Sequence, residues 1–145
     1  MSFICPIEPD KRHGLDVVRV KVPPIVPDPH GDREHEFIFD TGCQITMVSE
    51  DVATKLGLPL PSGGPLVNIT GSTAKGYGRL VEVRFRFPPD ANGKPGLEVD
   101  STWVVVSGAT DIALLGFMEV HRHYGIRSQE FNVFFISWAS LRGLP

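Results

Sequence analysis

The residues with the clearest chemical potential form the tripeptide Asp40-Thr41-Gly42, which directly follows the apolar run Phe37-Ile38-Phe39. The Thr41 hydroxyl can donate or accept a hydrogen bond, and Gly42 lets the backbone turn so that its N–H approaches the carboxylate. Such a tripeptide could hold the Asp40 carboxylate rigidly at the floor of a cleft. Peptide hydrolysis needs one group to deprotonate water and another to protonate the carbonyl oxygen. Two carboxylates that share one proton perform both tasks, whereas a single carboxylate performs them poorly.

Composition excludes several other classes of function. The chain has 145 residues with a formal charge of −3 and no clusters of Lys and Arg, so a nucleic-acid partner is not expected. No apolar run approaches the roughly 20 residues that span a bilayer, so no membrane association is expected. The first residues lack the pattern of a signal peptide, which favours a cytoplasmic location. The two cysteines, Cys5 and Cys43, have no zinc-type spacing, and reduced thiols are the simpler interpretation, although one disulfide is possible.

Fifteen glycines and thirteen prolines argue against a helical bundle and favour short strands joined by turns, in a single domain over residues 1–145. Ser49 is a plausible N-cap for a two-turn helix that ends at Gly57. A second short helix is expected from Phe117 to Tyr124, and Asn92-Gly93 is typical of a hairpin turn. Apolar and alternating runs predict strands at Leu15–Val22, Phe37–Phe39, Leu66–Thr70, Gly78–Phe87, Leu97–Val106 and Phe131–Ile136, with Leu114-Leu115-Gly116 as a further apolar segment and 23–36 as a surface loop.

Other residues favour structural roles. Alternation along Leu97–Val106 places Trp103 on the apolar face, so it is predicted to lie in the core. Residues two apart on a helix point to different faces, so His121 and His123 are not expected to hold a metal. No cofactor is expected either.

The segment from Phe37 to the helix after Ser49, with Asp40-Thr41-Gly42 and Thr46, resembles the active-site segment of the retropepsin-like aspartic proteases. That family includes retroviral proteases, the ubiquitin-linked DNA-damage-inducible proteases and bacterial relatives. The stretch 67–81 is similar to the family's glycine-bearing flap hairpin. Leu114-Leu115-Gly116 and the following helix resemble the segment that passes behind the catalytic aspartate. The resemblance covers roughly residues 15–136.

The resemblance implies a mostly β fold, a closed β-barrel half of an acid protease with a flap hairpin and one or two short helices. It implies Asp40 as the catalytic residue, Thr41 and Gly42 as its support, and substrate contacts from Cys43, Gln44, Gly71 and Ser72. Relatives usually carry Ala or Ser at the position of Cys43. The cysteine of this chain introduces an oxidisable thiol beside the carboxylate. Gln44 stands where retroviral members are often acidic, which suggests an altered subsite preference.

Assembly follows from the number of motifs. Two-lobed relatives carry two Asp-Thr/Ser-Gly copies, whereas this chain has one, because Asp100-Ser101-Thr102 lacks the glycine. An active enzyme would therefore take its second carboxylate from Asp40 of another copy, in a C2 homodimer that cleaves polypeptides. The strand Phe131–Ile136 is a candidate for the dimer sheet, since an unpaired apolar edge invites aggregation.

Two other interpretations stay open. The first is a peptide-binding or dimerisation module that keeps this fold without activity, and the second is an unrelated β-barrel ligand binder in which Asp-Thr-Gly is only a turn.

Overall fold

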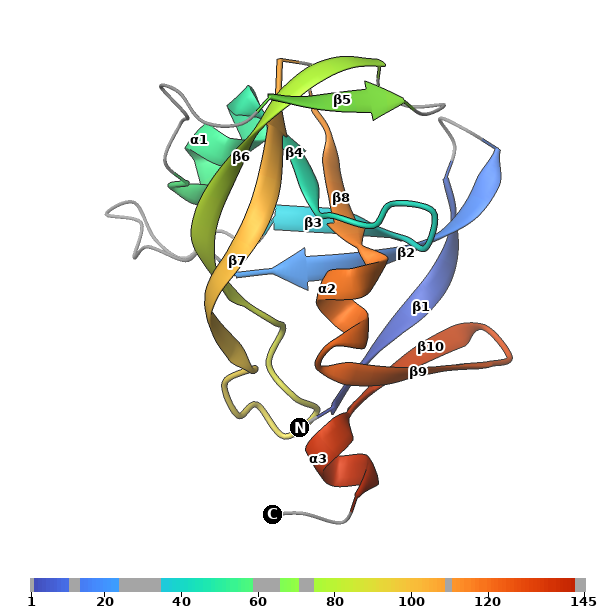
Figure 1. The fold of residues 1–145 in the computed structure, drawn as a ribbon. Coiled ribbons are helices and arrows are strands. Elements are labelled where there is room, and N and C mark those ends of the chain that lie inside the picture. Colours follow the sequence, from blue (N-terminus) through green and yellow to red (C-terminus); the bar gives the residue numbers. More distant parts are fainter. Residues whose placement is uncertain are drawn as a thin grey trace.

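The computed structural model describes residues 2–10, 14–23, 35–58, 66–70, 75–108 and 111–142. Within these ranges the chain forms ten strands and three short helices (Figure 1). The strands are β1 (Ser2–Asp10), β2 (Leu15–Val22), β3 (His35–Asp40), β4 (Met47–Ser49), β5 (Leu66–Thr70), β6 (Lys75–Arg86), β7 (Glu98–Ser107), β8 (Ala113–Gly116), β9 (Tyr124–Gln129) and β10 (Asn132–Ser137). The helices are α1 (Glu50–Leu56), α2 (Phe117–His121) and α3 (Trp138–Leu141). None of the described helices is long and apolar enough to cross a membrane.

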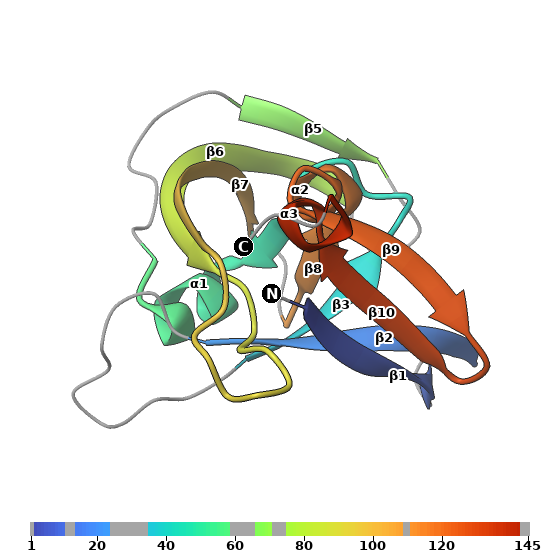
Figure 2. The same ribbon diagram turned by 90° about the horizontal axis from the view of Figure 1, so that it is seen from below.

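The strands form one strongly curved sheet in the order β5-β6-β7-β4-β8-β3-β2-β1-β10-β9. The predicted closed barrel is wrong, because closure requires the two end strands to pair. Here β5 and β9 end the sheet without pairing to each other, and the two views of Figures 1 and 2 show the sheet coiling round its core without meeting itself. The mostly β composition is confirmed.

Sequence patterns located the central elements well. The strands Leu15–Val22 and Leu66–Thr70 have the predicted bounds, and α1 begins after Ser49 and ends at Gly57, whose φ of 73° is the left-handed conformation that glycine favours. Asn92-Gly93 lies in the turn between β6 and β7, where the Asp90 carboxylate accepts hydrogen bonds from the backbone N–H groups of Asn92 and Lys94. Most residues of the predicted surface loop 23–36 lie outside the described ranges, while His35 and Glu36 already belong to β3.

The C-terminal part differs from the sequence predictions. The helix predicted to reach Tyr124 ends at His121, because Tyr124 begins β9 and is fully buried. The strand predicted at Phe131–Ile136 is β10, but it is not an unpaired edge. It pairs with β1 on one side and β9 on the other, so it cannot add a partner's strand.

The main core lies on one face of the sheet and is rich in aromatic rings. Phe3 of β1 stacks on Phe135 of β10 with 4.6 Å between ring centroids. Phe3 also contacts Phe87, directly after β6, and Tyr124 of β9, while Phe135 contacts Phe39 of β3. The alternating side chains Val81, Val83 and Phe85 of β6, and Phe87 directly after it, all point into this core, as their pattern predicts.

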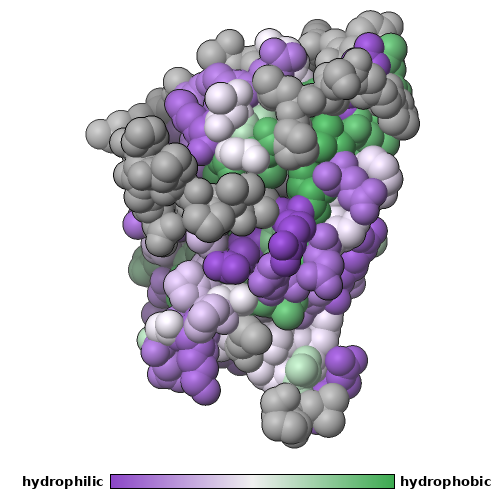
Figure 3. Space-filling model, turned by 90° about the vertical axis from the view of Figure 1, so that its left-hand side faces the viewer, coloured by the Kyte–Doolittle hydropathy of each residue, from purple (hydrophilic) through white to green (hydrophobic). Residues whose placement is uncertain are grey.

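A second, smaller apolar cluster lies on the opposite face of the central strands. Its buried members are Met47, Val105 and Leu114, whose immediate neighbours Val48, Val104, Val106 and Leu115 belong to the main core. Because successive side chains of a strand point to opposite faces, the same strands carry both clusters. Figure 3 shows that on the side carrying α1 and β6 hydrophobic surface gathers in the upper part, while the lower part is largely hydrophilic.

The prediction that Trp103 lies in the core is wrong, since 51% of the residue is exposed. The reason is a bulge in β7. Val83 of β6 pairs with Thr102 and Phe85 pairs with Val99, so β7 covers three residues where β6 covers two. The extra residue shifts the alternation by one, which turns Thr102 toward the main core and Trp103 toward the face of the second cluster.

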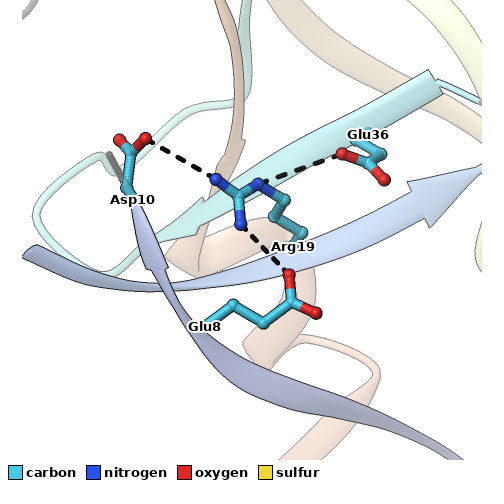
Figure 4. Close-up of polar contacts among 4 residues, drawn as sticks. All are labelled: Glu8, Asp10, Arg19 and Glu36. Atoms are coloured by element: carbon cyan, nitrogen blue, oxygen red, sulfur yellow. Dashed lines mark hydrogen bonds and ion pairs between the residues drawn. The ribbon is translucent and has the colours of Figure 1, made fainter. Parts of the chain in front are cut away.

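An ion-pair cluster joins the three strands β1, β2 and β3. The guanidinium of Arg19 lies 3.1 Å from a carboxylate oxygen of Glu8, 3.6 Å from Asp10 and 3.9 Å from Glu36 (Figure 4). Asp10 is buried, so its carboxylate depends on Arg19 and other local partners for its stabilisation.

Replacing Arg19 with Leu is therefore expected to lower the free energy of unfolding by about 1–3 kcal/mol, because a buried carboxylate loses its cation. Urea denaturation measures the change. Arg84→Leu serves as the control, since Arg84 is 63% exposed in its pair with Glu98 and is expected to cost about 0–1 kcal/mol. Equal losses in the two variants would contradict a special role for Arg19.

His123 gives the protein a dependence on pH. Burial lowers the pKa of His123, the nearby Arg122 acts in the same direction, and Glu119 opposes them. The native state therefore binds fewer protons than the unfolded state below the ordinary histidine pKa of 6.5, so stability is expected to fall as the pH falls from about 7 to 5. Urea denaturation at both pH values should show a smaller fall in His123→Gln than in the exposed-site control His121→Gln. An equal fall in both would contradict the assignment.

Candidate active site

The turn after β3 places the Asp40 carboxylate. Asp40 is the last residue of β3, and the Gly42 N–H donates a hydrogen bond of 2.9 Å to its Oδ1 atom. The Cys43 N–H donates to the Asp40 carbonyl oxygen at 3.1 Å, which closes the turn. A Cβ atom on Gly42 would lie 3.3 Å from Asp40 Oδ1, which is a tight contact. Glycine therefore leaves space for the carboxylate beside the backbone. The carboxylate is thus held by the backbone of its own tripeptide.

Strand β8 runs directly behind this turn and fixes it. Asp40 pairs with Gly116 in a parallel ladder, the Gly116 N–H donates to the Thr46 Oγ1 atom at 3.0 Å, and the Phe117 N–H donates to the Cys43 carbonyl oxygen at 2.8 Å. Thr46 is buried, and its hydroxyl is a positioning group that the tripeptide alone does not reveal. The hydrogen bonds tie both ends of the segment from Cys43 to Thr46 to the junction of β8 and α2.

Gly116 allows the close approach of the two segments. A Cβ atom there would lie 2.6 Å from both the Ile45 carbonyl carbon and the Thr46 nitrogen, which is closer than such atoms come in proteins. The backbone at Ile45 and Thr46 therefore occupies the space that the side chain of any residue other than glycine at position 116 would need.

The turn lies at the surface of the single chain. Asp40 is partly exposed, and Thr41, Gly42 and Gln44 are exposed. Water, a substrate or a second protein can therefore reach the carboxylate directly. Cys43 and Gln44 follow within the same turn, while Gly71 and Ser72 lie outside the described residues, so their assignment stays a prediction.

Cys43 is a protonated thiol that fills space beside the carboxylate. Its Sγ atom donates to the Ile45 carbonyl oxygen at 2.8 Å, and the side chain packs against the second apolar cluster. Burial raises the pKa of the thiol, and the Asp40 carboxylate raises it further. A neutral thiol is a poor nucleophile, so Cys43 is poorly suited to nucleophilic chemistry.

The second apolar cluster forms the surroundings of the turn. Besides Cys43 it includes Ile38, two residues before Asp40 on β3, and Ile112, which directly precedes β8. Val67 of β5 and Leu80 of β6 join it from the antiparallel hairpin at the other end of the sheet. The hairpin β5–β6 and the strand that ends at Asp40 thus contribute side chains to the same apolar cluster.

Comparison with known proteins agrees with this geometry. A sequence profile described as aspartyl protease matches residues 26–118, which is more than half of the chain and includes Asp40 and Gly116. The chain belongs to the aspartyl protease family. The crystal structure of a retropepsin-like aspartic protease from Rickettsia conorii is similar with a TM-score of 0.57, at 18% sequence identity, over 93% of this chain and 90% of that one. The protease fold is therefore of the retropepsin-like kind. A search of curated proteins finds no match.

Gly116→Ala tests the crossing of β8 and the turn. The methyl group would meet backbone atoms that cannot move independently, so the free energy of unfolding is expected to fall by about 1–3 kcal/mol. Gly108→Ala is the control, because a Cβ atom at Gly108 would meet nothing within 4 Å. Chemical denaturation of both variants measures the difference, and a Gly116→Ala protein as stable as its control would contradict the tight crossing.

Proposed function

We propose that the protein is a homodimeric aspartic endopeptidase whose active site joins Asp40 of two copies across a two-fold axis. One observation carries this proposal. A chain of the aspartyl protease family holds a single Asp-Thr-Gly on a rigid turn that is open to the surface. The tripeptide supplies one of the two carboxylates that the chemistry needs, so a second copy supplies the other.

The exposed turn suits a contact with an identical partner. The Thr41 hydroxyl is exposed in the single chain and is available for a hydrogen bond across the axis. In Figures 1 and 2 the hairpin β9–β10 projects on the same side as the segment that joins β3 to β4. Phe131, at the tip of that hairpin, is 80% exposed, which a partner's surface would cover. We assign this side of the molecule to the dimer contact.

The substrate would lie extended between the turn and the hairpin β5–β6, which would act as the flap through its connection at Gly71 and Ser72. Backbone hydrogen bonds would hold the polypeptide as an added strand, and side-chain pockets would select its sequence. The exposed amide of Gln44 can bond to the substrate backbone. Cys43 lines the apolar floor beside it.

The reaction follows from the paired carboxylates. One ionised Asp40 takes a proton from a water molecule, whose oxygen attacks the scissile carbonyl carbon. The protonated Asp40 of the other copy gives its proton to the carbonyl oxygen, which forms a neutral tetrahedral intermediate. The Asp40 that took the proton from water then gives it to the amide nitrogen, and the other Asp40 takes a proton from one hydroxyl of the intermediate. The C–N bond breaks, and no covalent bond to the enzyme forms.

Asp40→Asn tests this function, because asparagine keeps the shape of the turn but cannot exchange a proton. Cleavage of a peptide library across pH 3–8 is expected to fall by about a thousandfold or more, while the dimer persists. Mass spectrometry of the products and sedimentation of the protein measure the two quantities.

Asp100→Asn is the matched control, since Asp100 is exposed and begins the similar tripeptide Asp100-Ser101-Thr102. It is expected to cleave as the wild type does. Unchanged cleavage by Asp40→Asn would refute the proposal, and a monomer without cleavage in the wild type would favour the inactive binding module.

A further inference from the structure

We infer that a groove beside the Asp40 turn binds an apolar side chain of the substrate, several residues away from the scissile bond. The inference rests on the proposed function, since it takes the path of the polypeptide to cross Asp40. Trp103 is then a specificity-determining residue, which explains why this large ring is exposed.

The groove is a hollow of about 270 Å³ between three parts of the fold. Its walls come from the segment 44–46 after the Asp40 turn, from Leu80 and Trp103 on β6 and β7, and from Met118 on α2. Three of these side chains are both large and exposed, since Ile45, Trp103 and Met118 are 41%, 51% and 38% exposed. Exposed apolar side chains from separate elements that meet at one hollow indicate a binding surface.

The groove continues the apolar lining of the proposed cleft. Leu80 pairs with Val105 across the ladder of β6 and β7, and it belongs to the second apolar cluster as well as to the groove. Trp103 is two residues from Val105, so it lies on the same face of β7. One apolar surface thus runs outward from Val105 beneath the cleft to Trp103 in the groove.

The distance to the active site suits an extended polypeptide. Ile45 is three residues from Gly42, so their Cα atoms are at most about 11 Å apart. A substrate strand rises about 3.3 Å per residue and covers this distance in three or four residues. A homodimer would have two such grooves, one for each side of the scissile bond.

Gln44, Glu119 and Arg122 add polar groups to the groove, but apolar side chains supply most of its lining, which favours an apolar occupant. The Thr102 hydroxyl donates to the buried Glu119 carboxylate, whose other oxygen lies 3.8 Å from His123 Nε2. Glu82, which pairs with Trp103 across the ladder, accepts a hydrogen bond from Ser101. A buried aliphatic or aromatic side chain would gain free energy by leaving water, without competing for these bonds.

Tryptophan fluorescence tests the groove without any need for cleavage. The chain has two tryptophans, so Trp138→Phe leaves Trp103 as the sole reporter, and Asp40→Asn keeps the polypeptide intact. The probe is the oxidised insulin B chain, which has no tryptophan and is rich in apolar residues. Binding is followed by the anisotropy of a fluorescein label on the probe, and the surroundings of Trp103 by its emission maximum.

Saturable binding with a blue shift of the Trp103 emission is the expected result. Adding Met118→Glu should weaken binding at least about fivefold, because the charge would stand in the apolar groove. The matched control is Leu141→Glu, another exposed apolar residue, on α3, which should leave the affinity unchanged. Absence of saturable binding, or binding with unchanged Trp103 emission and equal affinities of the two variants, would overturn the inference. The proposed function is tested separately by cleavage, and it is refuted if the Asp40→Asn protein still cleaves peptides.

Discussion

The close crossing of the Asp40 turn over Gly116 is the constraint on which the site depends. The parallel pairing of β3 with β8 brings Asp40 beside Gly116, and the missing side chain lets the backbone of Ile45 and Thr46 pass directly across. Hydrogen bonds from the N–H groups of Gly116 and Phe117 to the Thr46 hydroxyl and the Cys43 carbonyl oxygen then fix the segment from Cys43 to Thr46. Under the proposed function, Asp40 would have to meet an identical carboxylate at a two-fold axis, and this geometry requires such rigidity.

The two faces of the central strands have different roles, one in the stability of the fold and the other in the proposed recognition of substrate. One face buries the aromatic core around Phe3, Phe87 and Phe135. The other carries the small cluster of Met47, Val105 and Leu114, which surrounds the turn and extends to Trp103. The bulge in β7 connects these roles, since one extra residue turns Trp103 from the core toward the groove. A local irregularity of the ladder thereby provides a candidate binding surface.

Sequence reasoning located the parts governed by local rules. The Asp40 turn, α1 with Gly57 and the alternating strand β6 follow from residue type and spacing. The exposure of Trp103 depends on a bulge, which pairing across strands sets and alternation within one strand cannot reveal. Strand β1 was not predicted, and it contains Pro6 and Pro9. Its pairing on both sides, with β10 and β2, makes β10 an internal strand. Openness of the sheet likewise depends on long-range pairing. The roles of Cys43, Gln44, Gly71 and Ser72 remain predictions.

Subunit mixing tests the shared active site most directly. Wild-type and Asp40→Asn chains are unfolded together, refolded at set ratios and assayed for cleavage. If each active site needs Asp40 from both copies, activity follows the square of the wild-type fraction, so an equal mixture retains about a quarter of the activity. An equal mixture that retains about half would show that each chain acts with its own carboxylate alone, which would contradict the account.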